Sequence, residues 1–228
     1  MVSDLLLTGM MVVGLGENCY SRPMLIPSVP ADLCLLYANT LSWRGRDVPA
    51  ETLHRLDDVL DWIARAALLG PRAAADLKHQ AGSAAAAEAG NAARSRLFAQ
   101  TLAMREAIFR LFSAAATGAP PPPRDFAALT RALAAAPVRD RLVRRHGACA
   151  WHIPPPGPAM PDILAPVLWS AGDLLLDAQG RRIQQCANDE CLWLFIDGSK
   201  NGTRRWCDMA SCGNRAKARR HYSRIRQA

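Results

Sequence analysis

The sequence is poor in aromatic residues, which make up 6% of its 228 positions, and it lacks any long uninterrupted apolar run. A helix that crosses a membrane needs about 20 consecutive apolar residues, so we expect no membrane span and no membrane partner. The apolar run from Leu5 to Leu15 follows Asp4, where a signal peptide carries positive charge, and no small-residue cleavage site follows it. These absences predict a cytoplasmic protein.

Sequence patterns that carry catalysis are also missing. There is no P-loop, no GxGxxG fingerprint, no HExxH motif and no Ser/His/Asp order with a credible local context. The five histidines are dispersed along the chain. We therefore expect a protein without enzymatic activity.

Apolar residues, alanine prominent among them, make up half of the chain. Alanine is the best helix former, and a chain of this length can bury a core of its own. We predict a mainly α protein with small β elements (α+β). The helical N-terminal domain is expected over residues 1–180, and a smaller C-terminal unit over residues 181–228.

Apolar periodicity and proline positions outline the elements of the first domain. A short strand is predicted at 10–13 and a β-hairpin at 141–153, turning at His146-Gly147. The stripe that begins at Leu53 and Leu56 indicates the buried face of a helix that opens at 48–51 with an early proline. Further helices are predicted at 31–41, twice within 73–116 with breaks at Gly82 and Gly90-Asn91, at 125–135 and at 160–177.

The seven cysteines fall into two sets. Three of them are scattered among apolar residues, which predicts buried free thiols: Cys19, Cys34 and Cys149. The other four lie together near the C-terminus. In a cytoplasmic chain a tight cluster of this kind favours a bound metal over disulfides.

The clustered cysteines have the spacing Cys186-x4-Cys191, then fifteen residues, then Cys207-x4-Cys212. Two close pairs joined by a segment that can fold back supply the four thiolates of a tetrahedral zinc site. Four protein ligands leave no position for water, so we predict one structural Zn²⁺ per chain. An iron–sulfur cluster, or His221 as a replacement ligand, are the alternatives.

The residues around these cysteines predict a β-hairpin and a helix. Residues 192–196 read as a strand, Asn201-Gly202 is a hairpin-turn signal, and 213–226 contain good helix formers without proline. The fourth ligand therefore sits at the start of the helix, in a treble-clef-like zinc finger. A unit this small buries little apolar area, so metal binding should supply much of its folding free energy.

Charge is concentrated in the same unit. Residues 181–228 carry a net charge of +7 out of the total of +8, and no acidic residue follows Cys212. A basic helix suits contacts with phosphates, whereas base reading needs side chains aimed into a groove. The candidate nucleic-acid-binding residues are Asn214, Arg215, Lys217, Arg220 and Arg224. The alternatives are a solubilising tail, and arginines 204, 205 and 215 bracing the finger against carbonyls or acidic groups.

The stretch CANDECLWLFIDGSKNGTRRWCDMASCGNRAKARRHYSR closely resembles the CGNR zinc finger, named for the tetrapeptide that begins at Cys212. The preceding chain resembles the ABATE domain of stress-induced bacterial transcription regulators. That resemblance rests on ADLCLLYANTLSWRG, LDDVLDWIARAALL, MREAIFRLF and ILAPVLWSAGDLL. The first 25 residues depart from the usual start of the family.

The resemblance implies a zinc-binding regulator that contacts double-stranded DNA through the finger. Its helical domain would sense an effector or form a homodimer, which an operator of useful length would require. The alternative is a zinc-stabilised adaptor that binds protein or RNA. If the helical domain binds a ligand, the candidate residues are Asn39, Thr40, Trp43 and Arg44, for which capping and core packing are the competing roles.

Overall fold

The computed structural model describes residues 24–26, 29–66, 75, 78–79, 88–139, 141–145, 147–153, 159–177 and 182–227. Helices dominate this part of the chain, and three small antiparallel sheets accompany them. The predicted fold class is therefore confirmed. No helix among the described residues is long and apolar enough to cross a membrane.

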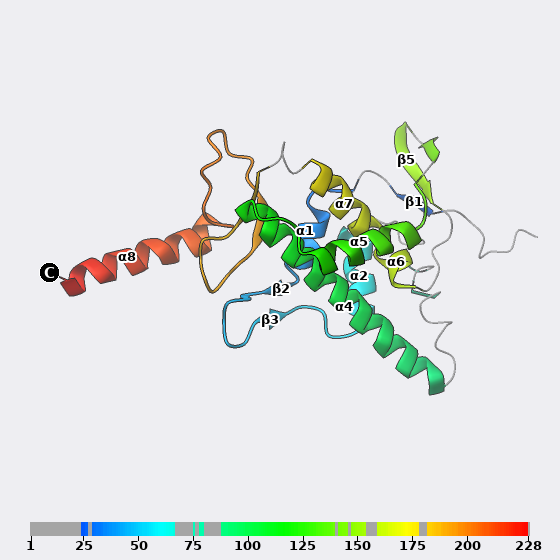
Figure 1. Cartoon of the computed structure of the whole chain (residues 1–228), viewed down its shortest axis with the longest axis horizontal. Helices are drawn as coiled ribbons and strands as arrows, with labels where there is room; N and C mark the ends of the chain where they lie inside the picture. The colour runs from blue at the N-terminus through cyan, green and yellow to red at the C-terminus, as the bar shows by residue number, and fades with distance from the viewer. Residues whose placement is uncertain are drawn as a thin grey trace, which may run out of the picture.

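The body of the molecule is built around a long helix, α4, which contacts the helices α1, α2 and α5 (Figure 1). The helices bury one apolar cluster, in which Leu33, Ile108 and Phe112 have no exposed surface. The helical bounds are α1 Leu33–Ala38, α2 Leu56–Ala66, α4 Glu88–Thr117, α5 Pro123–Ala135, α6 Met160–Ile163 and α7 Ala165–Leu176.

The strands form small sheets at three places in the described chain. Strand β5 (Ala148–Ile153) lies between β1 (Met24–Ile26) and β4 (Arg141–Arg145), and the β4–β5 hairpin turns at Gly147 with a positive φ of 83°. This confirms the predicted hairpin. Strand β2 (Leu41–Ser42) pairs with β3 (Ala50–Glu51), and β6 (Ile183–Gln185) pairs with β7 (Leu194–Ile196).

The C-terminal unit lies at the end of the molecule opposite the β1–β5–β4 sheet (Figure 1). After β7 the chain reaches a π-helix, η1 (Met209–Gly213), which runs into α8 (Asn214–Gln227). Helix α8 projects away from the body (Figure 1). The β6–β7 hairpin does not project: Ile183 and Leu194 are buried in the same apolar cluster as the helices of the body. The hairpin predicted to turn at Asn201-Gly202 is not formed, because β7 pairs with β6 and residues 204–206 are not in a strand, although a turn is present at 199–202.

Two helix predictions were wrong in detail. The segment expected to open a helix at 48–51 instead ends in strand β3, because Ala50 pairs with Ser42, and α2 begins only at Leu56. The expected stripe is nevertheless buried, including Leu53 and Leu56. The break predicted at Gly90-Asn91 is absent, since α4 continues through it. Glycine costs a helix about 1 kcal/mol relative to alanine, which the packing of a 30-residue helix can outweigh.

The helix predicted at 160–177 is divided into α6 and α7 at Leu164. Pro166 has no N–H to donate to the preceding turn, so it is tolerated only in the first turn of a new helix. Cys149 is exposed rather than buried, because it lies two residues after the Gly147 turn at the tip of the hairpin. The predicted strand at 10–13, Cys19, the break at Gly82 and the boundary at residue 180 lie outside the described residues.

Candidate metal centre

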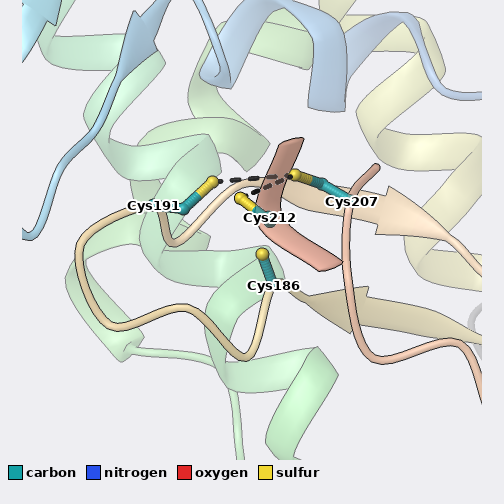
Figure 2. A group of neighbouring side chains, drawn as sticks. All are labelled: Cys186, Cys191, Cys207 and Cys212. Atoms are coloured by element: carbon teal, nitrogen blue, oxygen red, sulfur yellow. Dashed lines mark hydrogen bonds between the residues drawn. The ribbon is translucent and has the colours of Figure 1, made fainter. Parts of the chain in front are cut away.

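The four clustered cysteines come together as the spacing predicts. Their Sγ atoms all lie within 4.8 Å of one another, and the Sγ of Cys207 is 3.7 Å from those of both Cys191 and Cys212. Figure 2 shows the four side chains pointing toward one common region. Zinc bound to four sulfurs at about 2.3 Å places those sulfurs about 3.8 Å apart in a tetrahedron. The arrangement therefore fits a zinc ion without rearrangement of the chain.

Short backbone hydrogen bonds hold each pair in place. The N–H of Cys186, directly after β6, donates to the carbonyl of Trp193 at 2.8 Å, and the N–H of Cys191 donates to the carbonyl of Asn188 at 2.8 Å. Cys207 precedes η1, whose first turn is capped by the Asp208 carboxylate accepting from the N–H of Ser211 at 2.8 Å. This cap fixes the turn that presents Cys212.

The sulfurs lie in a largely buried, aromatic environment. Cys186, Cys191 and Cys212 are buried, and the partly buried rings of three tryptophans pack against them. These are Trp43 from the body and Trp193 and Trp206 from the finger. A cavity of about 290 Å³ opens beside the sulfurs. Exclusion of water strengthens the attraction between a cation and thiolates.

Crowding moves the pKa values of the thiols in opposite directions. The pKa of Cys186 falls to about 5, because the Cys191 thiol donates a hydrogen bond to its sulfur. The same hydrogen bond and burial raise the pKa of Cys191. Burial and the negative charge of Cys186 raise the pKa of Cys207 to about 12. Four neighbouring thiolates are thus compatible only with a compensating cation, which a divalent metal provides.

Asn188 links the metal centre to the basic helix. Its Nδ2 donates to the Sγ of Cys212 at 3.5 Å, and its Oδ1 accepts from the guanidinium of Arg219 at 3.0 Å. A hydrogen bond from a neighbouring residue to a metal-binding side chain fixes the orientation of that side chain. Asn188 can do this for Cys212. Neither Asn188 nor Asp208 was predicted from the sequence as part of the site. The Asp-x-x-Ser spacing of residues 208–211 is a capping signal that could have found the second of them.

One loop of the body, residues 39–46, makes several polar contacts with the finger. Asn39, buried after α1, donates from Nδ2 to the carbonyl of Leu194 at 2.8 Å and accepts from the N–H of Leu194 at 3.0 Å. The N–H of Gly45 donates to the carbonyl of Glu190 at 3.1 Å. A Cβ atom at Gly45 would lie 1.8 Å from the carbonyl oxygen of Asp189. Only glycine allows this approach.

The four residues predicted as a ligand pocket lie in this loop. Thr40 donates to the carbonyl of Tyr37 at 2.7 Å, and Arg44 donates to Glu106 at 2.6 Å. Trp43 lines the cavity beside the sulfurs, whereas Asn39 is engaged by β7. These contacts are the capping and packing roles that competed with ligand binding, and the ligand role stays a prediction.

The predicted nucleic-acid-binding residues lie on α8. Asn214, Arg215 and Lys217 are exposed, while the side chains of Arg220 and Arg224 lie outside the described part. Asn214 donates to the carbonyl of Ala210 at 3.1 Å, and the Arg215 guanidinium lies 4.6 Å from the ring centre of Trp43. These two side chains thus also brace the finger.

The contacts of Arg204 confirm the alternative that this arginine braces the finger against backbone carbonyls. Its guanidinium donates to the carbonyl oxygens of Trp206, at 3.0 Å, and of Cys207. It also lies 4.4 Å from the ring centre of Phe195. Arg204 therefore fastens β7 to the third cysteine.

Comparison with known protein families gives two matches in chain order. The model described as "Putative stress-induced transcription regulator", ABATE, matches residues 31–178, and the model of the CGNR zinc finger matches residues 182–225. No curated protein matches the sequence. The matched ranges contain the body and all four cysteines of the metal centre.

Proposed function

Since the chain belongs to the ABATE family and carries a CGNR zinc finger, we propose that it is a transcription regulator whose helix α8 contacts double-stranded DNA. One structural Zn²⁺ per chain would hold α8 in position, and the chain would have no catalytic role. Four thiolates fill the coordination sphere of zinc and leave no open position for substrate. The metal then has a structural role, and helix α8, which follows the fourth cysteine, binds the DNA.

The observation that carries this proposal is the charge and placement of α8. The helix has six lysines and arginines and no acidic residue, and it packs mainly on η1. It projects from the molecule (Figure 1), and Tyr222 and Ile225 in its second half are exposed. A projecting cationic helix can approach a polyanion without desolvating the rest of the molecule.

Contacts within the protein engage two of the basic side chains of α8. Arg215 stacks on Trp43, and Arg219 donates to Asn188 and lies 3.7 Å from a carboxylate oxygen of Asp189. Lys217 is exposed. We therefore assign phosphate contacts to Lys217, Arg220 and Arg224, and base contacts to Asn214 and Arg215 at the start of the helix.

The test is duplex DNA binding by the variant Lys217→Ala/Arg220→Ala/Arg224→Ala. Each phosphate contact contributes about 0.9 to the slope of log affinity against log salt. Losing three contacts should lower that slope by about 2.7 and abolish binding at physiological ionic strength. The measurement is fluorescence anisotropy of labelled duplex DNA across a salt series.

The matched control is Arg65→Ala/Arg124→Ala/Arg144→Ala, which removes three exposed arginines of the body. It changes the net charge equally and should leave DNA affinity nearly unchanged. Equal losses in the two variants would indicate a general charge effect. Unchanged affinity in the α8 variant would reject DNA contact by this helix and favour the adaptor alternative. Genome-wide selection of bound sequences should then also find no enriched motif.

A further inference from the structure

A separate cavity lies in the body, between α4, α5 and α6, and no residue of the finger lines it. It has a volume of about 650 Å³. Small-molecule sites in proteins occupy about 300–1,000 Å³. We propose that this cavity binds a small organic anion with an apolar body, of the class represented by medium-chain carboxylates.

The inner wall of the cavity is apolar and belongs to the core. Met104, Ala107 and Ala132 line it and are 4–5% exposed. Ala103 and Ala128 add further small side chains. Protein interiors are close-packed. A larger side chain such as leucine at these positions would occupy the volume that the alanines leave empty. The alanine-rich composition of α4 and α5 thus creates room for the apolar part of a ligand.

The rim of the cavity carries an excess of positive charge. Arg110 and Asp125 form a two-point ion pair, with nitrogen–oxygen distances of 2.8 and 2.7 Å. Arg131 also lines the cavity and is exposed. Among the residues that the structure describes, Arg131 has no hydrogen-bond or ion-pair partner. Two guanidinium groups and one carboxylate thus line the cavity, and the carboxylate is already paired with Arg110, so an incoming carboxylate would meet the donor fork of Arg131.

The placement of the cavity connects it with the finger through α4. Between Met104 and Ala107, the residues Arg105 and Glu106 bind Glu51 and Arg44 at 2.7 and 2.6 Å. Arg44 belongs to the loop that docks the finger, and Glu51 lies in β3, which pairs with β2 next to that loop. Further along α4, the Ser113 hydroxyl accepts from Gln185 of β6 at 3.1 Å. A ligand in the cavity would therefore contact the helix that also holds the finger, and its role as an effector rests on the proposed function.

The experiment uses octanoate as the probe and the methionine methyl resonances of the full chain as the readout. Met104 and Met160 line the cavity, whereas Met209 lies in η1 and reports on the finger. Octanoate should shift the methyl signals of Met104 and Met160 saturably and leave Met209 unshifted at low occupancy. Neutral 1-octanol should bind more weakly, because it lacks the charge that Arg131 recognises.

Two variants test the two halves of the site. Arg131→Gln should weaken octanoate binding about fivefold, as expected for one partly exposed charge pair. Its matched control is Arg124→Gln, on the same helix, exposed and not lining the cavity, which should bind octanoate normally. Ala128→Leu fills the cavity from a half-buried position and should abolish the methyl shifts.

Linear shifts without saturation, or equal shifts at Met209, would show nonspecific adsorption and overturn the proposal. Equal affinities of Arg131→Gln and the wild type for octanoate would overturn the anion specificity. The readout does not involve DNA, so failure of this site and failure of DNA binding by α8 are distinguishable. Octanoate binding in a chain that does not bind DNA would leave the cavity assigned and reject only the regulator.

Discussion

The body and the finger of this protein are stabilised by different means. In the body, leucines, isoleucines and aromatic rings from α1, α2, α4 and α7 form one large buried cluster. In the finger, the second cluster consists of Cys186, Cys191 and Cys212 with flanking tryptophan rings. The hydrophobic effect is sufficient for the first. The second is too small to fold by apolar burial alone, and we expect it to depend on a bound metal. The contrast predicts that one chain combines a core stabilised by apolar burial with a unit stabilised by its metal.

The two units are nevertheless joined more closely than their composition suggests. Strand β6 packs on α4, and Ile183 and Leu194 enter the core of the body. The finger's hairpin thus shares the hydrophobic core, whereas its cysteine loops do not. We therefore expect loss of the metal to destabilise the cysteine loops and α8 more than strands β6 and β7.

The largest effect should come from Cys207→Ser, which removes one thiolate from the metal centre. Structural zinc contributes about 10–16 kcal/mol of apparent binding free energy in isolated fingers, and a three-thiolate site would lose a large part of it. We expect zinc to fall well below one per chain, and the amides of 186–213 to lose hydrogen-exchange protection. The helices α1, α4 and α7 should remain protected.

Cys149→Ser is the control for that variant, since Cys149 is an exposed cysteine outside the cluster. It should retain zinc and protection throughout. Full zinc content and full protection in Cys207→Ser would reject the four-thiolate site. Loss of protection in the helices of the body as well would reject the division between the two units.

A smaller effect is expected from Gly45→Ala, which acts on the junction between the units. The added Cβ would overlap the backbone carbonyl of Asp189, which cannot move without shifting the cysteine loop. Overpacking of this kind costs about 1–3 kcal/mol. Urea denaturation measures the loss of unfolding free energy. Gly198→Ala is the matched control, because a Cβ there meets nothing within 4 Å and its φ is not in the left-handed region.

Asn39→Ala should have a similar or slightly smaller effect. It leaves the buried N–H and carbonyl of Leu194 without their side-chain partner. Unpaired buried polar groups cost about 1–3 kcal/mol each, and water at the edge of the junction would recover part of this. Asn201→Ala, in an exposed turn of the finger, should be close to neutral. Equal unfolding free energies of the two variants would mean that Asn39 does not hold the junction.

The smallest effect should be the acid sensitivity of the Glu51–Arg105 ion pair in the body. Burial by itself would raise the pKa of Glu51, but the hydrogen bonds and charge of Arg105, together with the N–H of Leu53, outweigh it and lower the pKa. A carboxyl whose pKa is lower in the folded state stabilises the fold above its unfolded pKa of about 4.3. That stabilisation is lost as the pH falls through the folded pKa.

We therefore expect the contribution of Glu51 to disappear below about pH 4, with a size under about 1 kcal/mol because solvent screens a partly exposed pair. The measurement compares urea denaturation of the wild type and Glu51→Gln at about pH 6 and about pH 3. The difference between the two proteins should shrink at the lower pH. The Cys186 thiol, with a pKa of about 5, also titrates between these two pH values, but it is common to both proteins, so its effect cancels in the comparison. A difference that grows with acid would contradict the assigned sign.

Local patterns predicted the helical class, the 141–153 hairpin and most of the buried stripe of α2. They failed where contacts distant in sequence decided the outcome. Ala50 and Glu51 follow a proline that favours a helix start, yet Ala50 pairs with Ser42 and Glu51 binds Arg105. Gly90-Asn91 resembles a helix break, yet α4 continues through it. In each case tertiary packing outweighed a propensity of about 1 kcal/mol.

The sequence by itself determined the metal centre and the charge of α8. Ligand spacing and net charge are local properties, so Cys186, Cys191, Cys207 and Cys212 could be read directly from it. Only the tertiary structure decided how the finger meets the body. The hydrogen bond from Asn39 to Leu194 joins residues 155 positions apart. The sequence around either residue does not predict this contact. Long-range pairing depends on the packing of the whole chain, and for that reason the docked finger and the α4–α5–α6 cavity became visible only in the folded protein.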